Sequence, residues 1–208
     1  MTYTKILVNL KILVNLAMFT AISALTHTAS AQAAPAGTQK LQLSAFGAIT
    51  GTFTDLEGGK NLGITAGADL TFLGFRLFRP AFEARGTYPI DKGHVSSQKN
   101  FLLGPKVEYP LGRFHPYVDF LFGRGEIVYH PPGFVVGNIE YISSNTTVYS
   151  PGVGLDYNLT HHLAVKADAQ FQHWDTPVTA SGVIHPTALT LGVVYNFDFN
   201  RGHRHNRP

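Results

Sequence analysis

The sequence predicts an all-β protein, an eight-stranded, antiparallel, up-and-down transmembrane β-barrel preceded by a cleavable signal peptide. Eight segments alternate apolar and polar residues with the period of two that is typical of strands. Short and long connections alternate between these segments. No stretch after residue 31 approaches the ~20 apolar residues of a spanning helix. A chain of this kind that enters a membrane has to close into a barrel, which pairs every backbone polar group internally.

The first 31 residues have the pattern of a secretory signal. Lys5 and Lys11 are basic, residues 12–25 are mostly apolar, and Ala29-Ser30-Ala31 is a small-residue cleavage pattern. The hexapeptide Lys-Ile-Leu-Val-Asn-Leu occurs at 5–10 and again at 11–16, which indicates a local duplication. We expect cleavage near Ala31, a short linker over 32–38 and the barrel over 39–199. An uncleaved anchor is the alternative, although Asn15 interrupts the apolar run.

The alternating faces of eight segments predict eight strands. In chain order they are residues 41–50, 62–72, 80–88, 101–109, 117–128, 149–159, 165–172 and 188–199. One face of each carries mainly apolar residues and the other carries small, polar or charged ones. In the fifth segment Arg124 and Glu126 continue the apolar side, so its faces are less clearly separated.

The final segment shows the pattern best. Its first face is apolar and ends in aromatic residues, and its second face is small or polar. The first face comprises Leu189, Leu191, Val193, Tyr195, Phe197 and Phe199; the second comprises Thr190, Gly192, Val194, Asn196 and Asp198. A strand with lipid on one side and a hydrated lumen on the other has this composition.

The connections predict which end of the barrel faces the cell exterior. Joins near 73–75, 110–113 and 160–162 are short, whereas those at 55–60, 89–98, about 129–145 and 175–185 are longer. Outer-membrane barrels have short periplasmic turns and long extracellular loops. A soluble β-sandwich or lipocalin-like cup is the alternative fold, but it would turn its apolar face inward.

Charged residues recur on the face assigned to the interior. They are Asp69, Glu83, Arg85, Lys106, Glu108, Asp119, Asp156, Lys166 and Asp168. Buried charges of both signs have to pair, and an eight-stranded barrel is just wide enough for side chains to fill. We therefore expect a filled lumen, which argues against a general porin.

Composition excludes several other classes of protein. The chain has no cysteine, so disulfides and thiolate metal sites are absent. Without Lys5 and Lys11 the 16 basic residues fall to 14, against 13 acidic ones. Arg201, Arg204 and Arg207 belong to the basic, His-containing tail at 200–208, so the pI of about 9.1 reflects the chain ends. It gives no reason to expect nucleic-acid binding.

Several segments resemble small outer-membrane β-barrel domain proteins of the OmpA/OmpX type over about residues 39–199. The segments are 101–106, Arg113-Phe114-His115-Pro116-Tyr117-Val118, 149–157, 167–174 and the last strand. The resemblance implies an integral protein of a Gram-negative outer membrane, inserted by the barrel assembly machinery through its final strand, with outer-membrane lipids around it and no cofactor. Family members commonly end on the terminal aromatic, whereas residues 200–208 continue beyond Phe199.

Candidate catalytic and metal-binding residues are few. His173, Asp175, Ser181 and His185 lie at the last long loop, where a lipid-modifying enzyme could hold a Ser-His-acid set. No spacing places a nucleophile beside its base, so we expect ordinary loop residues. His161-His162 on a turn and His203 and His205 in the tail are expected to be solvated and not metal ligands.

The sequence therefore predicts a structural or adhesive outer-membrane protein with no catalytic, cofactor or metal site. Any ligand would meet its long extracellular loops. The alternatives are an enzyme acting on outer-membrane lipid and a secreted soluble lipocalin-like binder. Trp174, with Tyr88 and Tyr149, is assigned to an interfacial aromatic girdle, with core packing as the other possibility.

Overall fold

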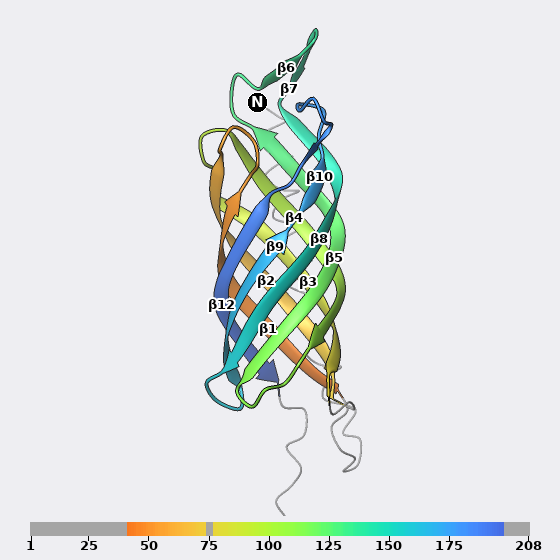
Figure 1. Ribbon diagram of the computed structural model, residues 1–208. Helices are drawn as coiled ribbons and strands as arrows, with labels where there is room; N and C mark the ends of the chain where they lie inside the picture. Colours follow the sequence, from red (N-terminus) through yellow and green to blue (C-terminus); the bar gives the residue numbers. More distant parts are fainter. Residues whose placement is uncertain (1–40, 74–76, 198–208) are drawn as a thin grey trace, which may run out of the picture. The chain divides into compact units, whose positions relative to one another are not determined.

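The computed structural model describes residues 41–73 and 77–197, and these residues form the predicted barrel (Figure 1). The predicted signal peptide, linker and basic tail, with Asp198 and Phe199, lie outside the described residues. Eight long strands build the wall within this part of the chain. They are β1 (Leu41–Phe53), β2 (Lys60–Phe72), β3 (Arg79–Asp91), β4 (Ser96–Glu108), β5 (Phe114–Tyr129), β8 (Ser143–Asn158), β9 (Leu163–Phe171) and β12 (Thr187–Phe197).

The wall closes on itself, so its long strands leave no open sheet edge. Each long strand pairs antiparallel with its neighbour in the chain, and β1 pairs with β12 to complete the circle, for example through Gly51 and Leu189. A closed antiparallel ladder satisfies the backbone polar groups that hydrocarbon could not. The predicted fold class is confirmed.

Four short strands extend the long-loop end of the barrel. A hairpin of β6 (Phe134–Val136) and β7 (Ile139–Tyr141) rises above the rim (Figure 1). Strand β10 (His173–Asp175) continues β9 after Gln172 and pairs with β11 (Val183–Ile184). At the other end the turns are tight: Leu111 N–H donates to Phe114 O at 2.7 Å. The barrel therefore has the loop asymmetry expected of an outer-membrane protein.

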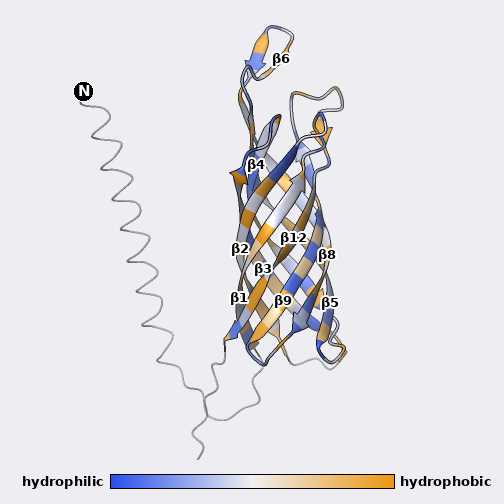
Figure 2. Cartoon of the chain, turned by 90° about the vertical axis from the view of Figure 1, so that its left-hand side faces the viewer, coloured by the Kyte–Doolittle hydropathy of each residue, from blue (hydrophilic) through white to orange (hydrophobic). Residues whose placement is uncertain are grey.

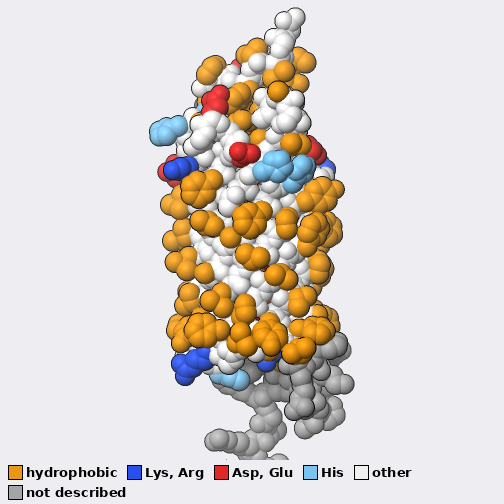
Figure 3. Space-filling model, viewed as in Figure 1, with side chains coloured by type: hydrophobic (Ala, Val, Ile, Leu, Met, Phe, Trp, Pro, Cys, Tyr) orange, Lys and Arg blue, Asp and Glu red, His pale blue; other side chains and the backbone are white. Residues whose placement is uncertain are grey.

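Hydrophobic and hydrophilic residues are interspersed along the strands (Figure 2), and their burial confirms the faces that the alternation predicted. Leu191, Val118 and Ile49 are 63%, 57% and 59% exposed, because they point away from the lumen. Arg124 and Glu126 also face outward, on the same side as Phe120 and Phe122. Figure 3 shows the outward apolar side chains as a band with charged and histidine side chains above and below it. This band is the surface that lipid would cover.

Most strands begin one or more residues earlier than predicted, and two of them begin at least five residues earlier. Strand β4 starts at Ser96 instead of 101, and β8 starts at Ser143 instead of 149. The expected long connection at 89–98 is therefore mostly strand, and only residues 92–95 separate β3 from β4. The ladder continues above the apolar band, as in the pairing of Ser96 with Tyr129. Residues there are polar on both faces, so alternation gives no signal of a strand.

Within the described part of the chain, no helix is long and apolar enough to cross a membrane.

Candidate functional site

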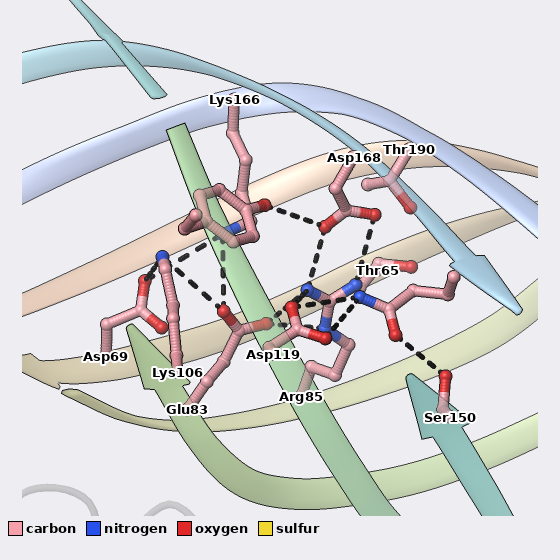
Figure 4. Close-up of polar contacts among 12 residues, drawn as sticks. Thr65, Asp69, Glu83, Arg85, Lys106, Asp119, Ser150, Lys166, Asp168 and Thr190 are labelled. Carbon is pink, nitrogen blue, oxygen red and sulfur yellow. Dashed lines mark hydrogen bonds and ion pairs between the residues drawn. The ribbon is translucent and has the colours of Figure 1, made fainter. Parts of the chain in front are cut away.

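The lumen contains a layer of buried ion pairs, which we call the ionic layer (Figure 4). Its charged members come from β2, β3, β4, β5, β8 and β9, and each is less than a tenth exposed. They are Asp69, Glu83, Arg85, Lys106, Glu108, Asp119, Asp156, Lys166 and Asp168. These are the nine charges that the alternation placed inside, so the prediction of a charged interior is confirmed.

Arg85 forms the centre of one half of the ionic layer. Its guanidinium donates to both carboxylate oxygens of Asp168, at 2.7 and 3.3 Å, and also pairs with Glu83. The Tyr117 hydroxyl donates to the same Asp168 at 3.1 Å. Asp119 lies 3.8 Å from Arg85 and accepts two hydrogen bonds of 3.0 Å from Gln170. A bidentate Arg–carboxylate pair fixes geometry as well as charge.

Two lysines form the other half. The Lys106 ammonium lies 3.3 Å from Asp69 and 3.2 Å from Asp156, and the Lys166 ammonium lies 3.3 Å from Glu83. Both ammonium groups also lie over the ring of Tyr117, at 4.0 and 4.4 Å from its centroid. Each cation therefore has several partners, as a fully buried charge requires.

Glycines on β8 make room for this packing. Gly152 and Gly154 face the lumen, and a Cβ atom at these positions would collide with Gln170 and with the Tyr117 ring, respectively. Further up, Thr50, Thr65 and Thr190 join hydroxyl to hydroxyl at 2.6 and 3.0 Å. Long side chains, glycines and threonines together fill the cross-section between the strands.

A second layer of packed side chains lies on the long-loop side of the ionic layer, and we call it the apolar cap. It consists of Leu56, Leu102, Leu121, Ile127, Tyr129, Val148, Trp174 and Ile184. Trp174 has no exposed surface, so its assignment to an interfacial girdle is wrong. Trp174 continues the series of every second residue that faces the lumen: Lys166, Asp168, Gln170 and Gln172. Its place above the ionic layer, beside Gly125, gives the indole an apolar setting.

At the short-turn end the lumen opens into a pocket of about 530 Å³. Arg79, Arg113 and His115 line it together with Glu108 and Asp156, which also belong to the ionic layer. His115 lies 3.8 Å from Glu108 and 3.1 Å from the Asn158 side-chain amide. The pocket is thus a polar vestibule beneath the ionic layer.

The four candidate catalytic residues at the rim do not form a triad. His173 Nδ1 and His185 Nε2 are 3.1 Å apart, and His173 Nε2 lies 3.7 Å from Asp175. The backbone N–H of His185 donates to Asp55 at 2.9 Å. Ser181, however, donates to Val183 O at 3.1 Å and lies 3.5 Å from the Thr179 hydroxyl, and in the described residues it has no histidine partner. A nucleophile needs its base within hydrogen-bond reach.

The turn histidines do not form a metal centre. The rings of His161 and His162 lie with centroids 5.5 Å apart, and His162 stacks on Tyr195. Among residues 41–73 and 77–197, no group of three or more histidine, aspartate or glutamate side chains could hold a metal ion. His203 and His205 lie outside the described residues.

Comparisons with known proteins agree with this architecture. The model of the outer membrane protein beta-barrel domain family matches residues 16–197. Neisserial surface protein A has a similar structure, with a TM-score of 0.50, 12% identity, and coverage of 79% of this chain and 100% of that one. The Yersinia pestis attachment invasion locus protein, Ail, gives a TM-score of 0.47 at 14% identity, covering 76% and 97% of the two chains.

The outer membrane enzyme PagL is also among the similar structures, with a TM-score of 0.42, 15% identity and coverage of 75% of this chain and 99% of that chain. At these identities the likeness concerns the fold alone. No curated protein matches the sequence. The closed barrel, its outward apolar band and the family match over residues 16–197 lead to one conclusion: the chain belongs to the outer membrane protein beta-barrel domain family and is an outer-membrane protein.

Proposed function

We propose that this protein has a structural or adhesive role at the cell surface and that it is not a general porin. The proposal combines a lumen filled by two packed layers with an apolar hairpin that projects outside the membrane. The first feature removes a route for solutes. The second exposes apolar surface to water, and binding a partner would bury that surface.

The lumen supports the first half of the proposal. In the ionic layer Lys106 and Lys166 are fully buried among their carboxylate partners. In the apolar cap Leu102, Leu121 and Trp174 expose no surface. A solute would have to break paired charges in one layer and displace packed side chains in the other, and both steps are costly.

The β6–β7 hairpin carries the adhesive half. Its turn contains Gly137 with φ +63°, and Val135 and Ile139, near its tip, are 68% and 57% exposed. At its base, Tyr129 packs edge-on against Phe134 with ring centroids 5.3 Å apart. An apolar tip held on a packed base, beyond the lipid band, is typical of a surface that binds another protein.

Whole-cell adherence tests the adhesive role. Cells expressing the full chain should adhere to immobilised host-surface proteins or cell monolayers more than vector-only cells do. Replacing both Val135 and Ile139 by Thr, which keeps strand propensity, should remove most of that gain. Leu111→Thr, the same kind of change in a periplasmic turn, is the matched control. Equal adherence by wild-type, Val135→Thr/Ile139→Thr and vector-only cells would exclude this role.

The rim geometry supports a non-enzymatic role, since Ser181 bonds to its own loop and not to His173 or His185. Expression of the wild type should therefore leave the lipid A and phospholipid profile of the cells unchanged. Mass spectrometry of extracted lipids checks this. A new lipid species that is lost with Ser181→Ala or His185→Ala would establish the enzymatic alternative.

A further inference from the structure

A groove of about 430 Å³ lies on the outer surface of the barrel near its extracellular end. Its walls come from β3, β4, β5 and β8, and its lining includes aromatic, uncharged polar and charged side chains. The ring-bearing residues are Tyr88 and Phe101, and the charged ones are Lys99, Arg124 and Glu126. The groove faces away from the lumen, so any ligand reaches it from the membrane or from the water above it.

The position of Arg124 along β5 places the groove at the outer edge of the lipid band. The outward residues of β5 from Phe114 to Phe122 are uncharged, and Arg124 is the next outward residue. Ten residues of a strand tilted by about 45° rise roughly 23 Å, against an apolar band of about 25 Å. Arg124 therefore lies at the height of the headgroups in the extracellular leaflet.

The charges in the groove do not balance. Lys99 and Glu126 face each other across β4 and β5 and form an ion pair of 2.8 Å. Arg124 pairs in register with Phe101, and the described residues provide it with neither an ion pair nor a side-chain hydrogen bond. Glu126 is two residues from Arg124 on the same face, but Lys99 already neutralises it. One guanidinium is left to attract an anion.

The lower part of the groove is shaped for apolar groups. Gly86 lies opposite Phe101 in the register, and a Cβ at Gly86 would have no atom nearer than 3.8 Å. The missing side chain leaves open space beside two rings, Phe101 at 57% exposure and Tyr88 at 58%. The site therefore presents an apolar floor at membrane depth with a cation at its upper edge.

We propose that this groove binds a phosphate of lipid A, the phosphorylated acyl disaccharide of the extracellular leaflet. The Arg124 guanidinium is suited to donate two parallel hydrogen bonds to a phosphate. Tyr88 and Phe101 would contact the sugar and the first carbons of an acyl chain. An amphiphile fits better than a free anion because the exposed rings of Tyr88 and Phe101 border the groove and face the lipid.

Binding of labelled lipid A to the full-length protein in octyl glucoside micelles tests the site, since this detergent carries no phosphate. Diphosphoryl lipid A should bind the wild type, and Arg124→Gln should weaken binding about tenfold, as expected for loss of a hydrogen bond between charged groups. Glu126→Gln frees Lys99 and should tighten binding. Arg113→Gln, in a periplasmic turn, should change nothing. Heat-modifiable migration on gels confirms that each variant is folded.

Binding of other ligands identifies which phosphate compound the groove recognises. Dephosphorylated lipid A should bind the wild type only as well as diphosphoryl lipid A binds Arg124→Gln. Displacement by millimolar inorganic phosphate would overturn the proposal in favour of a free-anion site. Equal affinity for phosphatidylglycerol would overturn the assignment to lipid A. Unchanged binding by both Arg124→Gln and Glu126→Gln would remove the site altogether.

Discussion

Arg85 and Asp168 are 83 residues apart in the sequence and meet in the lumen through two hydrogen bonds of 2.7 and 3.3 Å. Strands β3 and β9 do not pair with each other in the wall, so this contact crosses the inside of the barrel. Glu83 and Tyr117 also contact this pair, so side chains of β3, β5 and β9 are joined across the lumen. At this level of the lumen, ion pairs fill the interior, and the apolar cap fills the level above it.

Arg85→Met should destabilise the barrel strongly. The methionine keeps much of the side-chain volume but leaves Glu83 and Asp168 without their shared cation, and breaking a buried pair in this way costs about 3–5 kcal/mol. Urea unfolding in lipid vesicles, followed by gel mobility, measures the loss. Arg113→Met in the exposed turn is the control and should stay near wild type. Equal stability of the two variants would mean that the ionic layer contributes little.

Val193→Arg should destabilise the barrel because the side chain at this position faces lipid. Val193 is the middle one of the five exposed residues of β12 and is itself 49% exposed. The cost should be about 2–4 kcal/mol at the bilayer midplane and about 0–1 kcal/mol near an interface. Tyr195→Arg, nearer the end of the strand, should therefore cost less. The same unfolding assay compares the two, and a reversed order would contradict the assigned depth.

Gly125→Val should disturb the apolar cap. A Cβ at Gly125 would collide with the Trp174 indole and approach Val148 at 2.9 Å. Overpacking of this kind costs about 1–3 kcal/mol. Since Trp174 is the only tryptophan, its emission should be blue-shifted in the wild type and red-shifted in the variant. Quenching of the wild-type emission by water-soluble quenchers would conflict with a buried Trp174.

The purified protein should form no stable large channel in planar bilayers. The ionic layer and the apolar cap fill the lumen in series, with Lys106 and Lys166 buried in the first and Trp174 in the second. An eight-stranded barrel leaves little space beyond its side chains. A general porin in the same bilayer serves as positive control. Steady porin-like conductance would show that the lumen opens or that several chains form a pore.

The sequence alone determined which side of each strand faces lipid. Leu191 and Thr190 are neighbours, yet one is exposed and the other buried, because successive side chains of a strand point to opposite sides. That rule is local, so it also identified all nine interior charges. The same rule would have placed Trp174 inside, because it lies an even number of residues after Lys166 and Gln170. The wrong assignment came from the general preference of tryptophan for membrane interfaces.

Only the tertiary structure decided which residues meet. The pairing of Arg85 with Asp168, and of Trp174 with Gly125, depends on closure of the wall and on the stagger of strands far apart in the sequence. The start of β4 at Ser96 could not be predicted from alternation either, because backbone pairing continues where both faces of the strand are polar. The unpaired Arg124 could be read from the sequence as an irregularity, but its groove arises from the register of four strands. Alternation is set along one strand, whereas contacts and grooves are set between strands.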